Sequence, residues 1–332
     1  MRELAAVVRE ALSAAALIQS AYDAYDALTD TSVLTPPVAL PPDEALVAWI
    51  TMDDFVLVPG KAGDRRFYGF IARDASGGYS VAFRGTEGLL EWWDEFHVLM
   101  VPFKTFAHFG TVAEGFERIY QTLDLIAVDA QGRSYAAHEI DPSLTPDSPF
   151  TRKAAAMLRH DRAARARSAT EPAQAPARVT GHSLGAALAT LFVAENAATS
   201  AIPVRALQSF ASPRVGDRTF AAAFSQLKYE GAPLEAWRVY NRPDLVPMVP
   251  LEIEGFAHVG TPLELESRAS DAIAWTIPCF HALTSHEVCL GAAVPAGWSC
   301  DASNVGSLLG YARRLARKVL GIVPGRTTLT DP

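Results

Sequence analysis

The apolar residues at the start of the chain recur every three or four positions. Leu4, Val7, Leu12, Ile18 and Tyr22 belong to this series. This spacing places the apolar side chains on one face of a helix. We expect residues 1–33 to hold a helix that packs on the body of the protein, ended by the proline-rich run LTPPVALPP.

The next apolar runs are short and predict strands. FYGFIARD and GYSVAFRGT are separated by Ala75-Ser76-Gly77-Gly78, which indicates a hairpin. AEGFERIYQTLDLIAV has helical spacing and predicts a helix. From Arg178 onward, strand-like runs (ARVT, VRALQSF, EAWRVY) alternate with helix-like ones. This alternation is typical of an α/β fold with parallel strands and crossover helices.

Two further segments stand out. The stretch 87–104 carries Leu89, Trp92, Trp93 and Phe96 on one helical face. This face would either cover a binding site as a lid or pack statically in the core. The stretch 129–177 is rich in Pro, Ala and Arg, which predicts an insertion with a short charged helix and a flexible linker rather than a second domain. We therefore expect residues 1–332 to form one domain.

Charge and composition narrow the class of protein. The formal net charge is -8 and the pI is about 5.5, so no basic field is present for nucleic acid. Glu3, Arg9 and Glu10 interrupt the N-terminal apolar run, which leaves no recognisable signal peptide and no uninterrupted membrane span. On this reading the protein is cytoplasmic, with secretion by another route left open.

The cysteines give no metal site. Cys279, Cys289 and Cys300 have no CxxC spacing, and their odd number argues against a full disulfide framework, although one bridge is open. We expect no metal and no organic cofactor.

A serine between two glycines is the first sign of chemistry. Gly181-His182-Ser183-Leu184-Gly185 follows a strand-like run and precedes a helix-forming one. In that context, GxSxG predicts a sharp turn that exposes a nucleophilic serine at the carboxyl edge of a sheet. The alternative is a helix-capping serine between packing glycines.

An activated serine needs a base and an orienting carboxylate, in the chain order Ser, Asp, His for this kind of turn. Asp244 follows the strand-like EAWRVYN in a proline-bounded loop, where it could also be a turn former. Downstream, His258, His281 and His286 are candidates for the base. Thr284-Ser285-His286-Glu287 reads as a capping box that opens a helix, with His281 on the loop ahead of it.

Four blocks together resemble the class 3 lipase family, an α/β-hydrolase family that includes the fungal triacylglycerol lipases. They are VAFRGT, VTGHSLGAALA, SFASPRVGDRTFA and NRPDLVPMVP, in family order within roughly Ala21 to Leu290. The resemblance implies an α/β-hydrolase fold, with a mostly parallel central sheet, flanking helices and a lid helix after FRGT.

The resemblance also implies roles for single residues. Ser183 would be the nucleophile and Asp244 the orienting acid, and the backbone amides of Thr86 and Leu184 would form the oxyanion hole, with the Thr86 hydroxyl as a further donor. His281 is favoured as the base because an aliphatic residue follows at the family's spacing, although a histidine replaces the aromatic residue expected next. The second choice is His286, and His258 would be structural.

The function implied is hydrolysis of carboxylic esters of the acylglycerol type through an acyl-enzyme. The partner would be a lipid or a small ester, with transient contact between the lid and a lipid interface. Alternatives are a short-chain or feruloyl-type esterase, a phospholipase or monoacylglycerol-type specificity, and a catalytically silent binding scaffold of the same fold.

Overall fold

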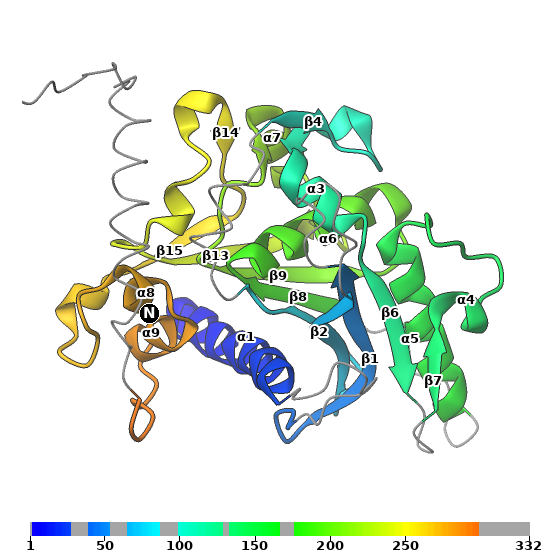
Figure 1. Ribbon diagram of the computed structural model, residues 1–332, viewed down its shortest axis with the longest axis horizontal. Helices are drawn as coiled ribbons and strands as arrows, with labels where there is room; N and C mark the ends of the chain where they lie inside the picture. The colour runs from blue at the N-terminus through cyan, green and yellow to red at the C-terminus, as the bar shows by residue number, and fades with distance from the viewer. Residues whose placement is uncertain are drawn as a thin grey trace, which may run out of the picture.

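The structure, a computed structural model, describes residues 2–27, 39–53, 65–86, 99–128, 133–166 and 176–298. A nine-stranded sheet runs through it, in the order β15-β13-β9-β8-β3-β2-β1-β6-β7 (Figure 1). The strands are β1 (Glu44–Asp53), β2 (Arg65–Asp74), β3 (Tyr79–Phe83), β6 (Asp124–Val128), β7 (Ser134–Ala136), β8 (Ala177–His182), β9 (Val204–Phe210), β13 (Glu235–Asn241) and β15 (Thr261–Leu265).

The sheet has two halves with different strand directions. From β3 through β8, β9 and β13 to β15 each pair of neighbours is parallel. From β3 through β2, β1 and β6 to β7 each pair is antiparallel. The expected α/β class with parallel strands is confirmed. Because parallel strands end at one edge of the sheet, loops that follow β3, β8 and β13 meet there.

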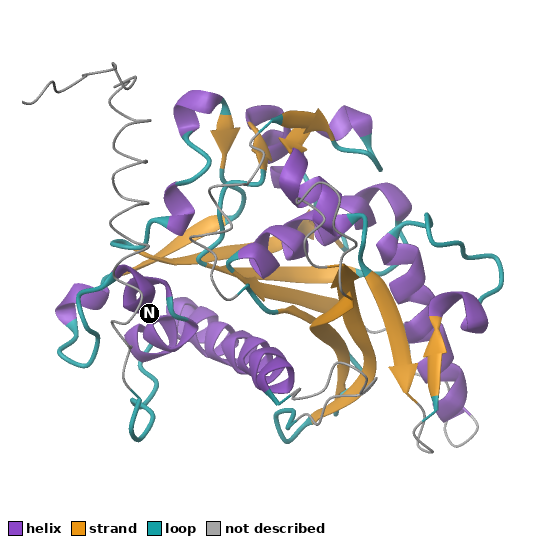
Figure 2. Cartoon of the chain, viewed as in Figure 1, coloured by secondary structure: helices purple, strands orange, loops and turns teal. Residues whose placement is uncertain are grey.

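Helices cover both faces of this sheet (Figures 1 and 2). Helices α3 (Glu114–Tyr120), α5 (Phe150–Ala166) and α6 (Leu184–Thr199) share one core, and α1 (Arg2–Asp26) and α9 (Leu283–Cys289) lie on the opposite face. Successive residues of a strand point to opposite faces. On β3, Val81 and Phe83 therefore belong to the α6 core, and Ala82 packs with α1. Helix α6 is buried from Leu184 to Asn196.

Smaller elements complete the fold. They are helices α4 (Ala137–Ile140), α7 (Arg218–Ser225) and α8 (Ile277–His281); 3-10 turns η1 (Ala107–Phe109), η2 (Val246–Met248), η3 (Glu252–Glu254) and η4 (Ser267–Ala269); a sheet of β4 (Met100–Pro102), β5 (Thr111–Ala113), β10 (Gly216–Asp217) and β14 (Phe256–Ala257); and the pair β11 (Lys228–Tyr229) and β12 (Ala232–Pro233).

Helix α1 is long and apolar enough, from Leu4 to Asp26, to pass a length and composition test for a membrane span. In the structure, 44% of that stretch is buried. Ala11, Ala15 and Ile18 pack in one cluster with Val239 of β13 and with α9. The apolar face of α1 is therefore used for packing on the sheet.

Two predicted helices differ from the structure. The run expected to be one helix from Ala113 to Val128 is helical only over α3, and its end is strand β6. A short apolar run such as DLIAV fits a strand or a helix equally well by periodicity, and pairing with β1 decides it. Within 87–104, residues 99–104 contain strand β4 rather than helix; residues 87–98 lie outside the described part.

The expected insertion at 129–177 also differs from the prediction where it is described. Helix α5 is 17 residues long, and Ala154, Met157 and Leu158 on it are buried in the main core. The many Ala and Arg residues made this segment look poorly able to pack. Its alanines at 154–156 are instead buried, Arg152 and Arg159 are exposed, and Arg165 donates to the Tyr79 hydroxyl of β3. Residues 133–166 are thus part of the body.

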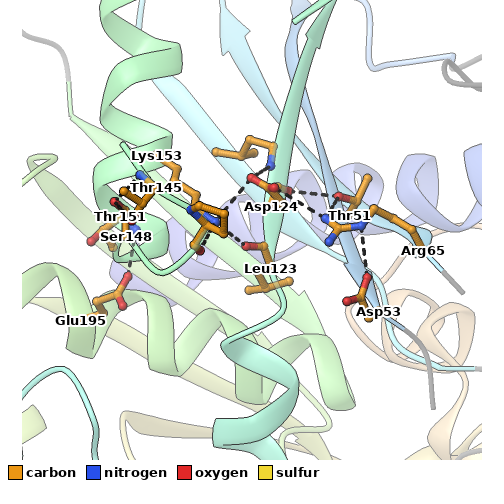
Figure 3. Close-up of polar contacts among 12 residues, drawn as sticks. Thr51, Asp53, Arg65, Leu123, Asp124, Thr145, Ser148, Thr151, Lys153 and Glu195 are labelled. Carbon is orange, nitrogen blue, oxygen red and sulfur yellow. Dashed lines mark hydrogen bonds and ion pairs between the residues drawn. The ribbon is translucent and has the colours of Figure 1, made fainter. Parts of the chain in front are cut away.

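Polar contacts at the start of α5 fix it to the sheet (Figure 3). The Lys153 side chain is buried, and its Nζ donates to the Pro146 carbonyl at 2.9 Å and lies 3.5 Å from Asp124 Oδ1 on β6. The Thr151 amide donates to Glu195 Oε2 on α6 at 2.8 Å. Lys153 is paired with a carboxylate and Glu195 accepts hydrogen bonds, so burying these two charged side chains is compatible with a stable fold.

Candidate active site

The turn between β8 and α6 presents the serine of the GxSxG motif. Ser183 has φ 60° and ψ -125°, a positive φ that side chains other than glycine rarely adopt. The turn is held on both sides: the Ser183 amide donates to Phe210 O at 2.9 Å, and its carbonyl accepts from the Ala186 amide at 3.0 Å. This is the strained strand-to-helix turn that the motif predicts.

The two glycines of the motif allow this turn to pack against its neighbours. A Cβ on Gly181 would lie 2.3 Å from the Gly185 carbonyl oxygen, and one on Gly185 would lie 2.2 Å from the Arg84 carbonyl oxygen. Both distances are too short for real atoms. The start of α6 therefore lies directly on the ends of β8 and β3, and no other residue fits at either position.

Three side chains form a hydrogen-bonded line at this edge of the sheet. His281 Nδ1 lies 2.8 Å from Asp244 Oδ2, and His281 Nε2 lies 2.9 Å from Ser183 Oγ. A carboxylate only accepts hydrogen bonds, so Nδ1 carries the proton and Nε2 is free to accept from the serine hydroxyl. The other Asp244 oxygen accepts from the Val246 amide at 3.0 Å, which fixes the carboxylate.

Each member of the line stands at an element end. Ser183 follows β8, Asp244 comes three residues after β13, and His281 is the last residue of α8. Ser183 and Asp244 are buried, whereas the His281 side chain is 17% exposed. The structure thus brings together the three residues predicted as nucleophile, acid and base. The geometry suits proton transfer from a serine hydroxyl to an imidazole.

The other two candidate histidines have different partners. His286 lies inside α9, fully buried, and its Nδ1 donates to the Ala282 carbonyl at 2.9 Å. His258 Nε2 donates to the Pro247 carbonyl at 2.8 Å. Burial lowers the pKa of His286, and burial, with Arg238 and Arg214 nearby, lowers that of His258 to about 3. Both are therefore neutral and packed at physiological pH.

The predicted capping box is wrong. Helix α9 begins at Leu283, so Thr284 and Glu287 lie inside it. The side-chain cap in this region is Thr276, whose hydroxyl accepts from the Cys279 amide and opens α8, which ends at His281. A proline follows Thr276 in the first turn of α8, which strongly indicates a helix start. The prediction was instead based on the later Thr-Ser-His-Glu run.

The predicted oxyanion donors lie beside the serine. Leu184 is the first residue of α6, where backbone amides point out of the helix and favour a developing negative charge. Thr86 follows Gly85, and a Cβ on Gly85 would lie 3.0 Å from the Ser183 Cβ. The Thr86 hydroxyl contacts the Tyr68 hydroxyl, which fixes its rotamer. The predicted lid residues Leu89, Trp92, Trp93 and Phe96 lie outside the described residues.

Two residues at the site were not predicted from the sequence. The His182 ring contacts the His281 ring with 4.7 Å between centroids and the planes tilted by 39°, and His182 Nδ1 lies 2.8 Å from the Tyr22 hydroxyl. His182 occupies the position in GxSxG that the motif leaves free, and Tyr22 belongs to the apolar face of α1. The position of His182 next to Ser183 only weakly indicates a role at the site. Nothing in the sequence around Tyr22 indicates one.

Comparisons with known proteins agree with this architecture. The family model described as Lipase (class 3) matches residues 80–254. Phospholipase A1-II 1 of Oryza sativa subsp. indica is 29% identical over 199 residues, covering 57% of this chain and 43% of the relative. Phospholipase A1-II 5 of the same subspecies is 32% identical over 200 residues, covering 57% of this chain and 38% of the relative. The chain thus spans less than half the length of these curated relatives.

Solved lipase structures share the fold. A triacylglycerol lipase whose catalytic centre is described as a serine protease triad superposes with a TM-score of 0.52, at 17% identity, over 84% of this chain and 92% of that one. A deletion mutant of the Rhizomucor miehei lipase in its propeptide complex gives a TM-score of 0.51, at 18% identity, over 84% of this chain and 77% of that one. The α/β-hydrolase fold is confirmed. The family match covers more than half of the chain, including the serine turn and the Asp244 loop, and the chain therefore belongs to the class 3 lipase family.

Proposed function

We propose that this protein hydrolyses carboxylic esters of lipids through an acyl-serine intermediate on Ser183. The observation that carries this proposal is the hydrogen-bonded line from Ser183 through His281 to Asp244, directly behind a strained turn at a helix N-terminus. These parts are what acyl transfer requires: a nucleophile, a base in a fixed tautomer and donors for an oxyanion.

In the first half of the reaction, Ser183 Oγ attacks the ester carbonyl carbon while His281 Nε2 takes the hydroxyl proton. The carbonyl oxygen becomes an oxyanion between the amides of Leu184 and Thr86. The imidazolium, facing the Asp244 carboxylate through Nδ1–H, then gives its Nε2 proton to the alcohol oxygen as the C–O bond breaks. In the second half, water repeats these steps on the acyl-serine and releases the carboxylic acid.

The test is hydrolysis of p-nitrophenyl esters from acetate to palmitate by the wild type and by three variants. Ser183→Ala should lose on the order of 10⁴-fold or more in kcat, since the remaining oxyanion hole retains only a small part of the catalysis. His281→Ala should be comparably impaired. His286→Ala should stay active wherever it folds, because His286 faces the Ala282 carbonyl rather than Ser183.

Circular dichroism on each variant separates loss of the site from loss of the fold. Full turnover by folded Ser183→Ala would reject the proposal. A folded, active His281→Ala together with an inactive His286→Ala would move the base to His286.

The names of the rice relatives favour one substrate class in particular, the phospholipids. Release of fatty acid from phosphatidylcholine vesicles, with the position of the cleaved chain identified by mass spectrometry, compares this substrate with triacylglycerol. Cleavage at sn-1 alone would support phospholipase A1 specificity. A short-chain or feruloyl-type esterase would instead prefer p-nitrophenyl acetate or feruloyl esters over both lipids.

The segment 87–104 is proposed to act as a lid with Leu89, Trp92, Trp93 and Phe96 toward lipid. Rates on a short-chain ester below and above its solubility limit test this. A rise in rate at the limit is expected for a lid that opens on a lipid interface. A smooth saturation curve through the limit would argue against it.

A further inference from the structure

We infer that Tyr22 of α1 is a positioning residue of the active site, which links the oxyanion strand, the serine turn and the backbone of the base through one chain of hydrogen bonds. This inference rests on the proposed function, because it assigns Tyr22 a part in the same reaction. It concerns a hydroxyl more than 150 residues away from Ser183 in the sequence.

The chain has three links. The Gly85 amide donates to the Tyr22 hydroxyl oxygen at 2.8 Å. The same oxygen lies 2.8 Å from His182 Nδ1. His182 Nε2 lies 2.8 Å from the His281 carbonyl oxygen. One phenol hydroxyl therefore connects the residue before Thr86 with the residue before Ser183, and through His182 with the base.

The direction of each hydrogen bond follows from the chemistry of the partners. A carbonyl only accepts, so His182 Nε2 carries a proton. Complete burial, with His281 and His286 close by, holds the pKa of His182 well below its usual value, so the ring is neutral and Nδ1 has a lone pair. The Tyr22 hydroxyl consequently donates to Nδ1 and accepts from Gly85. The chain satisfies every polar atom in it.

The first consequence concerns the oxyanion hole. Gly85 is held from both sides, because its amide donates to Tyr22 and its carbonyl accepts from Arg84 Nη1 at 2.7 Å. A Cβ at Gly85 would lie 2.3 Å from the Tyr22 oxygen, so the hydroxyl fills the space beside this residue. The next amide in the chain is that of Thr86. A donor must be placed to within a fraction of an ångström to stabilise an oxyanion, and Tyr22 restricts the strand that carries it.

The second consequence concerns the base. The His182 ring lies against the His281 ring at 4.7 Å between centroids, and its Nε2–H donates to the His281 carbonyl oxygen. During the reaction His281 becomes an imidazolium. A neutral neighbour with its lone pair occupied by Tyr22 does not compete for that proton, whereas a protonated one would repel it.

The experiment compares the steady-state kcat and KM of the Tyr22→Phe and Tyr25→Phe variants for hydrolysis of p-nitrophenyl butyrate. Tyr25 lies one turn further along α1 and contacts the Arg84 guanidinium with its ring, at 3.6 Å to the centroid, which phenylalanine retains. For Tyr22→Phe we expect kcat to fall about 10-fold or more with KM within about twofold, since transition-state contacts and not substrate binding are disturbed. Tyr25→Phe should match the wild type. A folded Tyr22→Phe variant with kcat within about twofold of the wild type would overturn the inference.

A double-mutant cycle distinguishes positioning from mere stabilisation. If Tyr22 acts through His182, Tyr22→Phe and His182→Gln should not be additive, and the double variant should lose little more than the worse single variant. Additive losses in kcat would contradict the link. If Tyr22→Phe does not fold, a ¹⁵N spectrum of the wild-type imidazoles is the measurement: His182 should show protonated Nε2 and a hydrogen-bonded, unprotonated Nδ1, and the opposite tautomer would overturn the assignment.

A third readout separates this inference from the proposed function. A p-nitrophenyl phosphonate forms a bond from phosphorus to Ser183 Oγ and releases p-nitrophenolate without any natural substrate. If the wild type hydrolyses no ester yet is labelled at Ser183, the substrate proposal fails while the Tyr22 inference is still tested by the labelling rate. We expect that rate to fall in Tyr22→Phe by the same factor as kcat, and equal rates in the two proteins would contradict the inference.

Discussion

Ser183 is held in a backbone conformation that suits glycine better than serine, with φ 60° and ψ -125°. Such a conformation costs on the order of 1–3 kcal/mol in a residue that has a Cβ. The surrounding contacts impose it: β8 ends directly before Ser183, α6 begins directly after it, and the amide is held by Phe210. The hydroxyl is thereby directed toward His281 and away from the sheet.

This strain makes a prediction about stability. Ser183→Gly and Ser183→Ala both remove the nucleophile, but only glycine relieves the positive φ, so Ser183→Gly should be more stable than Ser183→Ala by about 1 kcal/mol. Urea denaturation of the two inactive proteins measures the difference. An alanine variant as stable as the glycine variant would mean that the turn carries no strain.

Gly185 allows a second prediction at this scale. Gly185→Ala places a methyl group 2.2 Å from the Arg84 carbonyl oxygen and 2.6 Å from that of Phe83, so α6 must move away from β3. We expect a loss of about 3 kcal/mol in the free energy of unfolding and a strong loss of turnover.

The control for this variant is Gly77→Ala. Gly77 has φ 88° but nothing within 4 Å of an added Cβ, so this change should cost only about 1 kcal/mol and leave activity unchanged. Equal effects of the two substitutions would show that the close approach at Gly185 does not matter.

At the same scale, the sequence predicted Ser183 and Asp244 because each stands in an ordered block of the family. The residue pattern alone could not decide between His281 and His286 as the base, because they are only five residues apart. Only the break between α8 and α9 at Ala282 directs their rings apart. His182 and Tyr22 escaped prediction for a related reason. Their partners are 99 and 160 residues away in the chain, and no local pattern records such contacts.

Two buried glutamates lie where α3 packs on α6, and Glu195 joins the two helices by a hydrogen bond. Glu195 on α6 accepts from the Tyr120 hydroxyl at 2.9 Å and from the Thr105 hydroxyl at 3.0 Å. Glu117 on α3 accepts from the Lys104 amide at 3.2 Å. Burial, reinforced by the neighbouring Glu195, raises the pKa of Glu117 to about 7. The helix pair therefore holds a carboxylic acid that stays protonated well above its usual range.

The raised pKa of Glu117 predicts how α3 responds to pH. Between about pH 4.5 and 7 the unfolded chain releases this proton and the folded protein keeps it, so Glu117 lowers stability as pH rises through that window. Glu117→Gln should remove this loss, and its stability relative to the wild type should improve by about 3 kcal/mol between pH 4.5 and pH 8.

Urea denaturation across this pH range is the measurement, with Glu114→Gln in the same helix as the control for removing a glutamate. A difference between Glu117→Gln and the wild type that does not change with pH would contradict the raised pKa.

Among the elements, prediction succeeded where the apolar pattern was long or bounded by turn residues. The β2–β3 hairpin, α1, α6 and the strands from β8 to β13 are of this kind. It failed for β6, a five-residue apolar run continuous with α3, and for α5, whose alanines bury well but look weakly apolar in sequence. In both cases a tertiary partner decides the state of the segment.

At the scale of the whole molecule, the fold keeps three histidines neutral: His182 and His286 are buried, and His258 is half-buried. Burial lowers the pKa of His182, His258 and His286, so the unfolded chain binds protons near pH 6.5 that the folded protein does not. Stability should therefore be lost as pH falls below about 6.5, and the opposite effect of Glu117 makes this loss smaller.

Denaturation midpoints from pH 7.5 to 5 test this acid sensitivity. His258→Gln should reduce the slope, whereas His160→Gln, at an exposed position on α5, should leave it unchanged. A stability that is constant over this range would show that these histidines are protonated in the folded protein.

The chain of hydrogen bonds through Tyr22 also bears on how the protein folds. Its links span 63, 160 and 99 residues, and contacts of such high sequence separation form late, after long loops have closed. While His281 is still inside the ribosome, the emerged chain contains α1 and the serine turn but lacks the histidine that completes the hydrogen-bonded line. The proposed ester hydrolysis thus requires that His281 has also left the ribosome and joined the folded body.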